Sequence, residues 1–340
     1  MAVTPDPHIV VIGGGTGSFT VLSALKKHTR NITAIVNMSD DGGSTGILRD
    51  EMGALPPGDV RQCLVALSRA PESMRTLFNY RFEGQGGLGG HAFGNLLLTA
   101  LEKTTGNFGA AVQTASKILN VVGQVLPVTL EDCRLVHVDS DGAKITGQHA
   151  VEEYVMRPGT RPHLLLEPAV TLNPLVARAL ARANLVVIAP GNLYASLAPT
   201  LLVPGFGDAL AATAAPLVNV TNLVTKPGQT DGFHVADYAA EIERFIQPRR
   251  LDYVIYNNHE PDEALLRTYA AAGEYGVAIG RARLDAAHYR AIGMPLVSGD
   301  IPAQSPGDTL IRRTLIRHDG PRLAERIMGI INGTYGPIQK

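Results

Sequence analysis

The chain lacks the features that would place it in several common classes of protein. Only two cysteines occur among its 340 residues, too few for a disulfide framework or a thiolate zinc site, so we expect Cys63 and Cys133 to be buried as small apolar side chains. Lys plus Arg and Asp plus Glu nearly balance at 30 and 31, which disfavours nucleic acid as a partner. No apolar run reaches about 18 residues, and the opening MAVTPDPHIV has no basic segment before an apolar stretch. We therefore expect a cytoplasmic protein with no membrane span and no signal peptide.

The chain does contain a repeated alternation of short β-branched runs with helical segments rich in alanine and leucine. This alternation predicts an α/β fold with a mainly parallel sheet and helices on both faces, and we expect residues 1–340 to form one domain. The clearest predicted strands are His8–Ile12, Thr33–Asn37, Leu185–Ala189, Leu217–Thr221 and Leu251–Asn257. Because ligands of such sheets bind beyond the carboxyl ends of the strands, the loops that follow them form the expected site.

One region breaks the alternation. Residues His91–Thr105 and Asn107–Asn120 have the pattern of two consecutive helices, and the stretch LVHVDSDGAKITGQH predicts a hairpin with its turn at Ser140–Gly142. We expect residues 100–170 to form an inserted helical and hairpin subdomain packed on the main sheet. The segment Asp319–Asn332 predicts an amphipathic helix that closes the chain.

The first predicted strand runs directly into a glycine loop and then a helix. Its residues are Gly13, Gly14, Gly15, Thr16 and Gly17. Glycines at this position allow a pyrophosphate to approach backbone N–H groups at a helix start, although a tight turn is the alternative. The loop is neither a dinucleotide fingerprint, because Ser18 stands where glycine is required, nor a Walker loop. The second strand ends in Asn37 rather than an acid, so no redox cofactor is expected.

An acidic loop follows the second predicted strand at the same edge of the sheet, with the residues Asp40, Asp41, Gly42, Gly43 and Ser44. Adjacent carboxylates are commonly neutralised by Mg²⁺ shared with phosphate oxygens. The alternative is a helix-capping aspartate in a solvated turn. Asp59 begins the next helix, where a cap and a metal or substrate role are equally compatible with its position.

Further polar residues follow later strands or begin helices: His91, Asn95, Gly191, Asn192, Ser196, Lys226 and Asn257. We treat them as candidate contacts to a nucleotide, with helix caps and surface turns as the alternatives. The sequence has no CxxC pair, and we do not expect hydrolysis through a serine or cysteine triad.

Five ordered motifs together resemble the CofD/YvcK family, and specifically its YvcK branch: GGGTG, SDDGGSTG, LPPGDVRQCL, GHAFGN and TKPGQTDGF. The resemblance runs from about residue 8 to 335. It implies a Rossmann-like nucleotide-binding fold. For the YvcK branch it implies binding of UDP-sugars such as UDP-N-acetylglucosamine and a role in carbon-source adaptation, cell shape and wall synthesis. For the CofD branch it implies transfer of a 2-phospholactate-type group with Mg²⁺.

The resemblance also assigns roles to individual residues. It implies that the loop Gly13–Gly17 binds phosphate, that the metal lies at Asp40, Asp41 and Asp59, and that Tyr269 and Arg317 close on the uridine end. Ile47 stands where similar sequences often carry arginine, which leaves Arg49 to compensate.

The sequence therefore favours a nucleotide-sugar-binding regulatory protein. Its expected protein partners are further copies of the chain, in a homo-oligomer, and a cell-wall enzyme. The alternative is a phospholactate-type transferase in which Asp59 is catalytic. An NAD-dependent oxidoreductase is a third hypothesis that rests on the first strand–loop–helix unit alone.

Overall fold

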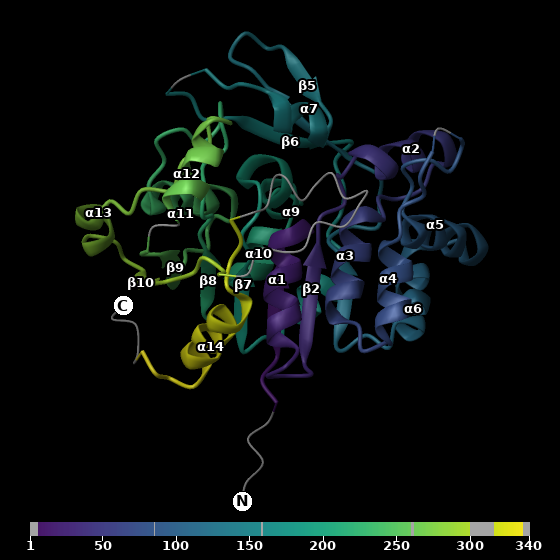
Figure 1. The fold of residues 1–340 in the computed structure, drawn as a ribbon, viewed down its shortest axis with the longest axis horizontal. Helices are drawn as coiled ribbons and strands as arrows, with labels where there is room; N and C mark the ends of the chain where they lie inside the picture. The colour runs from purple at the N-terminus through teal and green to yellow at the C-terminus, as the bar shows by residue number, and fades with distance from the viewer. Residues whose placement is uncertain (1–5, 85, 158, 260–261, 300–315, 336–340) are drawn as a thin grey trace, which may run out of the picture.

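A seven-stranded sheet organises the chain, and all of its strand pairs are parallel (Figure 1). The fold is taken from a computed structural model that describes residues 6–84, 86–157, 159–259, 262–299 and 316–335. In spatial order the strands are β3 (Gln124–Pro127), β2 (Ile32–Val36), β1 (Ile9–Ile12), β7 (Leu185–Ile188), β8 (Leu217–Val220), β9 (Tyr253–Asn257) and β10 (Arg290–Met294).

The five strands predicted from the sequence all belong to this sheet, which confirms the predicted fold class. Strands β1, β2, β7 and β8 are buried along their whole length, because helices cover both faces of the sheet. The two edge strands β3 and β10 were not predicted. Their sequences QVLP and RAIGM contain a proline and a glycine and lack the β-branched runs of the central strands.

The order of the strands reverses direction between β1 and β7. The chain builds outward from β1 through β2 to β3, and then returns to the other side of β1 to build β7 to β10. Ile12 is aligned with Ile35 of β2 and with Ile188 of β7, so the loops that follow these three strands begin level with one another. Such a reversal creates a crevice at the carboxyl edge, where ligands of open α/β sheets bind.

Helices cover the sheet in two groups. Helices α1 (Gly15–Leu25), α3 (Gly58–Leu67) and α14 (Gly320–Ile331) lie on the face toward the viewer in Figure 1, where α1 packs against the other two. The other group includes α8 (Pro174–Ala181), α9 (Ala198–Leu201), α10 (Phe206–Ala211) and α11 (Val235–Phe245). Within it, α10 packs against α8 and α9, and α9 packs against α11. The predicted closing helix is confirmed as α14, and Asp319 caps it by accepting a hydrogen bond from the Arg322 N–H.

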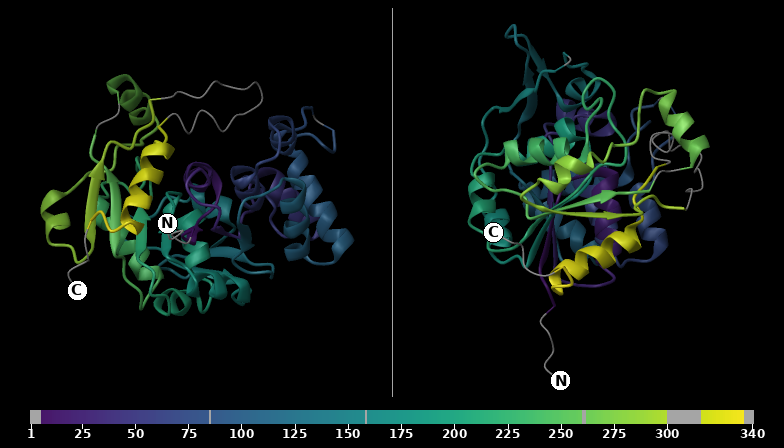
Figure 2. Two further views of the ribbon diagram at one scale, coloured as in Figure 1. Left: turned by 90° about the horizontal axis from the view of Figure 1, so that it is seen from below. Right: turned by 90° about the vertical axis from the view of Figure 1, so that its left-hand side faces the viewer.

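A helical lobe fills the connection between β2 and β3. It contains α2 (Gly43–Met52), α4 (Glu72–Asn79), α5 (Phe93–Thr105) and α6 (Phe108–Ile118), and Figure 2 shows α4 to α6 beside the sheet rather than over its centre. The two predicted consecutive helices are α5 and α6. Smaller helices α12 (Glu263–Ala270) and α13 (Arg281–Asp285) flank β9 and β10.

A second, antiparallel sheet lies beyond the carboxyl ends of the main strands (Figure 1). Its strands are β4 (Arg134–Val138), β5 (Lys144–Thr146) and β6 (His163–Glu167), and helix α7 (Gln148–Glu153) follows β5. Strands β4 and β5 form the predicted hairpin. This small sheet falls inside the predicted range 100–170, whereas β3, which also falls there, pairs with β2 in the main sheet.

Both cysteines are free and buried, as the sequence predicts. They belong to a continuous core of buried apolar side chains that spans the main sheet and its helices. Among the described residues, no helix is both long enough and apolar enough to cross a bilayer.

Gly17 allows the start of α1 to lie close to the loop that follows β7. A Cβ atom at this position would lie 1.8 Å from the Pro190 carbonyl oxygen, which is backbone and cannot rotate away. We expect Gly17→Ala to lower the free energy of unfolding by about 1–3 kcal/mol or more, measured by urea titration. Gly276→Ala is the matched control because no atom lies within 4 Å of its Cβ position, and it should be neutral. Equal stability of the two variants would contradict this packing.

Candidate functional site

The glycine loop lies directly against the side chain of Asp59. Gly13 and Gly15 have φ values of 139° and 64°, which side-chain-bearing residues rarely adopt. A Cβ atom on Gly14 would lie 2.1 Å from Asp59 Oδ2, and the Gly15 N–H donates a hydrogen bond to the Asp59 carboxylate. The loop therefore accommodates a carboxylate of the protein itself, in addition to any phosphate that approaches the start of α1.

Asp40 approaches the same place from the acidic loop after β2. Its carboxylate accepts a hydrogen bond of 3.0 Å from the Gly42 N–H and another from the Thr45 hydroxyl. Gly58, at the start of α3, leaves room for it, because a Cβ atom there would lie 2.7 Å from Asp40 Oδ2. The side chains of Asp40 and Asp59 both retain partial exposure to solvent. They form a pair of carboxyl groups, which we call the Asp40–Asp59 pair, that a ligand can reach.

The Asp40–Asp59 pair resists ionisation. Surrounding protein removes water from both groups, which raises the pKa of Asp40 and raises the pKa of Asp59 to about 7. The negative charge of Asp40 contributes further to the shift at Asp59, while the Gly15 N–H and Arg61 oppose it. A bound cation would relieve both the loss of hydration and the repulsion.

Asp41 points to a different partner. Its carboxylate accepts hydrogen bonds from the backbone N–H groups of Gln148 at 3.0 Å and His149 at 2.8 Å, and Arg134 Nη1 lies 3.7 Å away. Although Asp40 and Asp41 are adjacent in sequence, the structure places Asp41 at the N-terminus of α7. Its described contacts are those of a helix cap.

The donor set of the Asp40–Asp59 pair suits Mg²⁺ bound together with a phosphate. Among the residues that the structure describes, no group of three or more His, Cys, Asp or Glu side chains is arranged to hold a metal alone. Mg²⁺ commonly takes one or two protein carboxylates and completes its shell with phosphate oxygens and water. Two carboxylates beside a glycine loop and a helix start meet that requirement.

Ser44, His91 and Asn95 come together as a buried network. Ser44 Oγ lies 3.0 Å from His91 Nδ1 and accepts a hydrogen bond of 3.2 Å from Asn95 Nδ2. Arg61 Nε donates to Asn95 Oδ1 at 2.9 Å, and the same guanidinium also binds Asn79. This network fixes the start of α2 against α3 and α5, so it holds Gly42, Gly43 and Ser44 beside Asp40.

Arg49 does not take the place of the arginine that is absent at position 47. The guanidinium of Arg49 is buried and donates to the carbonyl oxygens of Asp40 at 2.9 Å and Cys133 at 2.7 Å. It also pairs with Asp132 at 2.6 Å. Arg49 therefore anchors the acidic loop to the start of the small sheet, which corrects its expected role as a phosphate contact.

The loop after β7 is held by two asparagines. Asn192 caps the short π-helical turn η1 (Leu193–Leu197), because its side-chain oxygen accepts hydrogen bonds from the Tyr194 and Ala195 N–H groups. Ser196 lies within that turn. Asn222, which follows β8, donates to the Gly191 carbonyl oxygen at 2.8 Å and so joins the two loops. Asn222 was missed in the sequence, although its place just after a strand is the signal shared by the other candidates.

Lys226 lies in the loop that follows β8. Its ammonium group is 3.8 Å from Glu152 and 4.0 Å from Glu153, at the limit of an ion pair, and its side chain is 29% exposed. It thus remains accessible at the rim of the sheet, with only weak competition for its charge.

The remaining candidates lie farther along the sheet, around β9 and β10. Asn257 accepts a hydrogen bond from the Leu296 N–H at 2.9 Å, and the Tyr269 hydroxyl accepts one from the Ile316 N–H at 2.9 Å. The Arg317 carbonyl oxygen accepts from the Ser298 N–H at 2.8 Å. β7 and β8 separate this group from β1 and the glycine loop.

His318 joins the C-terminal segment to the rim. It was not identified as a site residue from the sequence. Its Nε2 atom lies 3.1 Å from the carbonyl oxygen of Thr221, at the end of β8. Burial lowers the pKa of His318 to about 4, so this side chain is neutral at pH 7. A histidine after an apolar run gave no sequence signal for such a contact.

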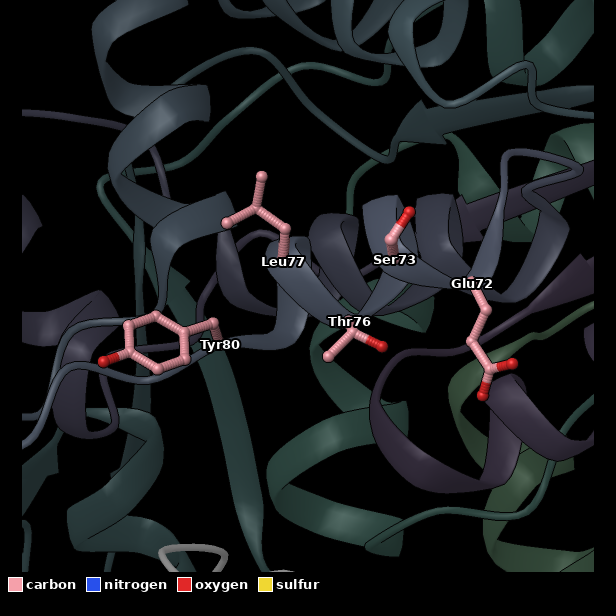
Figure 3. Close-up of a pocket in the computed structure, with 5 residues that line it drawn as sticks. All are labelled: Glu72, Ser73, Thr76, Leu77 and Tyr80. Atoms are coloured by element: carbon pink, nitrogen blue, oxygen red, sulfur yellow. The ribbon is translucent and has the colours of Figure 1, made fainter.

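Two surface hollows lie outside the candidate site. One, of about 600 Å³, is lined by Glu72, Ser73, Thr76, Leu77 and Tyr80, which come from α4 and the residue after it (Figure 3). The other, of about 480 Å³, lies between β10 and α14. Neither is lined by a residue predicted to bind nucleotide.

The raised pKa of Asp59 predicts a pH dependence of stability. From pH 4 to 7 the folded chain retains a proton that the unfolded chain, with an ordinary Asp pKa of 3.8, has released. Stability from this group therefore falls as pH rises, by at most about 1.4 kcal/mol per pH unit. Asp59→Asn should gain stability relative to the native protein between pH 4.5 and 7.5, as measured by urea unfolding. The exposed Asp285→Asn is the control, and parallel curves for Asp59→Asn and the native protein would contradict the shift.

Comparisons with known proteins identify the family of the chain. The family model of 2-phospho-L-lactate transferase CofD matches residues 9–297. A protein of Nostoc sp., named as a gluconeogenesis factor, is 44% identical over 81% of this chain, and the match spans 60% of the Nostoc protein's own length. The gluconeogenesis factor of Listeria monocytogenes is 32% identical over 96% of both chains.

A solved structure supports the same relationship. The crystal structure of a UPF0052 family protein from Bacillus halodurans superposes with a TM-score of 0.86 at 33% identity, covering 96% of this chain and all of that one. The chain therefore belongs to the CofD family, on the branch that contains the gluconeogenesis factors.

Proposed function

We propose that the protein binds a nucleoside diphosphate sugar of the UDP-N-acetylglucosamine kind together with Mg²⁺, and that it acts in the cytoplasm as a regulator of carbon metabolism, cell shape and wall synthesis. The observation that supports this most directly is the Asp40–Asp59 pair beside the glycine loop. A phosphate that approaches this loop meets two carboxyl groups, so it binds well only with a cation between them. The naming of relatives as gluconeogenesis factors supports the link to carbon metabolism.

Each group at the rim has a task in this proposal. The Asp40–Asp59 pair holds the cation, and the free N–H groups at the start of α1 bind the diphosphate. Mg²⁺ neutralises charge on the diphosphate when it is bound. Lys226 and Asn192 contact the sugar, and Arg317 contacts the base. The described residues around Ser44 and His91 keep the acidic loop in place rather than touching the ligand.

Calorimetric titration tests the proposal. The native protein should bind UDP-N-acetylglucosamine in the presence of Mg²⁺, and removal of Mg²⁺ with a chelator should weaken binding at least about tenfold, a loss of about 1.4 kcal/mol. Asp40→Asn should show the same loss even with Mg²⁺ present, whereas Asp285→Asn should bind as the native protein does. Absence of binding to any UDP-sugar at millimolar concentration would refute the proposal.

A phospholactate-type transferase is the second candidate, and the ionisation of Asp59 favours it specifically. A general base works best when its pKa lies near the working pH, and Asp59 has a pKa of about 7 beside the glycine loop. In this reaction Asp59 would accept the proton of the attacking hydroxyl. The oxygen of that hydroxyl would form a bond to the phosphorus of the phospholactate group, and the P–O bond to the departing nucleoside monophosphate would break, while positioning and charge neutralisation promote the transfer.

Turnover distinguishes the two candidates. A transferase should release nucleotide from a nucleoside diphosphate-linked phospholactate donor when an alcohol acceptor is present, and Asp59→Asn should reduce the rate at least about 100-fold, within the range typical of general-base loss. Asp41→Asn provides a neighbouring carboxylate control that should retain activity. No release of nucleotide with any such donor would leave only the binding function.

A further inference from the structure

Helix α7 lies between two of the rim loops and contacts both. Its N-terminus meets the acidic loop at Asp41, and its C-terminus meets the loop of Lys226. It also packs against η1, the turn after β7. At six residues, it is about 9 Å long. One short helix of the inserted segment is thus in contact with loops on both sides of the reversal between β1 and β7.

The N-terminal contact is close and specific. Asp41 accepts the N–H groups of Gln148 and His149, and Asn37 Nδ2 donates to Gln148 Oε1 at 2.8 Å. Gly147 has a φ of 110°, and a Cβ atom there would lie 2.6 Å from Asp41 Oδ2. A larger residue at position 147 would push the helix away from the acidic loop.

The C-terminal contact involves Gln229, three residues after Lys226. Its amide nitrogen Nε2 lies within hydrogen-bond distance of three carbonyl oxygens at the end of α7, those of Val151 at 2.7 Å and of Glu152 and Tyr154 at 3.2 Å. The Met156 N–H donates to the Gly228 carbonyl oxygen at 2.8 Å. These bonds satisfy helix-end carbonyl groups that would otherwise lack partners.

From these contacts we propose that α7 is a spacer that fixes the Lys226 loop relative to the acidic loop, and that Asp41 is a positioning residue for Lys226 rather than a metal ligand. Asp41 has no described contact with the Lys226 loop, so its effect there passes through α7. Displacing either end of the helix removes the constraint on the other. The consequence for ligand affinity rests on the proposed function, whereas the mechanical coupling does not.

Hydrogen exchange of the ligand-free protein tests the coupling. Loss of a helix cap costs about 1 kcal/mol, which corresponds to about fivefold faster exchange through local opening. Asp41→Ala should therefore speed exchange about fivefold at residues 225–232 as well as at 148–150. Asp41→Asn keeps only one of the two acceptor oxygens that the Gln148 and His149 N–H groups use, so it should speed exchange less than Asp41→Ala does. Exchange within α14 should not change in either variant, which controls for general loss of stability.

A variant at the other end of α7 completes the test. Gln229→Ala should speed exchange at the N–H groups of Gln148 and His149, because coupling between two sites is reciprocal. If Asp41→Ala affects only residues 147–150, or Gln229→Ala affects only its own loop, the proposed coupling is refuted. This result is independent of whether the protein binds a nucleotide at all.

Titration with UDP-N-acetylglucosamine and Mg²⁺ then separates positioning from metal binding. A positioning role predicts weaker binding for Asp41→Ala and a smaller loss for Asp41→Asn, which keeps one of the two acceptor oxygens. A metal ligand would lose affinity equally in both variants, and that outcome would overturn the assignment of Asp41. If the native protein binds no nucleotide, the proposed function fails while the exchange experiment still decides the role of α7.

Discussion

The rim of this protein is arranged around two carboxyl groups that are held close enough together to repel each other. Asp40 and Asp59 lose part of their hydration to surrounding protein, and the charge of Asp40 makes ionisation of Asp59 still less favourable. Gly14 and Gly58 provide the space that the two side chains occupy. A folded chain retains such an arrangement at a cost in stability, and strained or unfavourable groups of this kind cluster at functional sites.

The surrounding contacts keep the Asp40–Asp59 pair in place from several sides. The Ser44–Asn95–Arg61 hydrogen bonds tie the acidic loop to the helical lobe, and Arg49 ties it to the start of the small sheet. Asp41 extends the same loop to α7. The inserted sheet is therefore part of the rim, and the loops it joins arise from opposite sides of the strand reversal. This arrangement brings residues that are far apart in sequence together at the rim.

The central strands and the edge at which they end could be predicted because burial on both faces requires a continuous run of apolar residues. Runs such as IVVI and LVVI are short and rich in β-branched residues, which favours a buried strand over a buried helix, and parallel strands bring their following loops together. The edge strands β3 and β10 lack such a run of β-branched residues. Spacing also could not show that the neighbours Asp40 and Asp41 point to different partners, since that depends on the distant helix α7. The same limit applies to Asn222 and His318, whose contacts are set by tertiary packing.

The chain belongs to the CofD family and has gluconeogenesis factors among its relatives, and the proposed binding function depends on a cation at the Asp40–Asp59 pair. The most direct test is a crystal of the protein grown with UDP-N-acetylglucosamine and Mn²⁺, in which anomalous scattering locates the cation. The account predicts one strong peak between the carboxylates of Asp40 and Asp59, in contact with a diphosphate oxygen beside Gly15. A peak at Asp41, or a diphosphate bound away from the glycine loop, would contradict it.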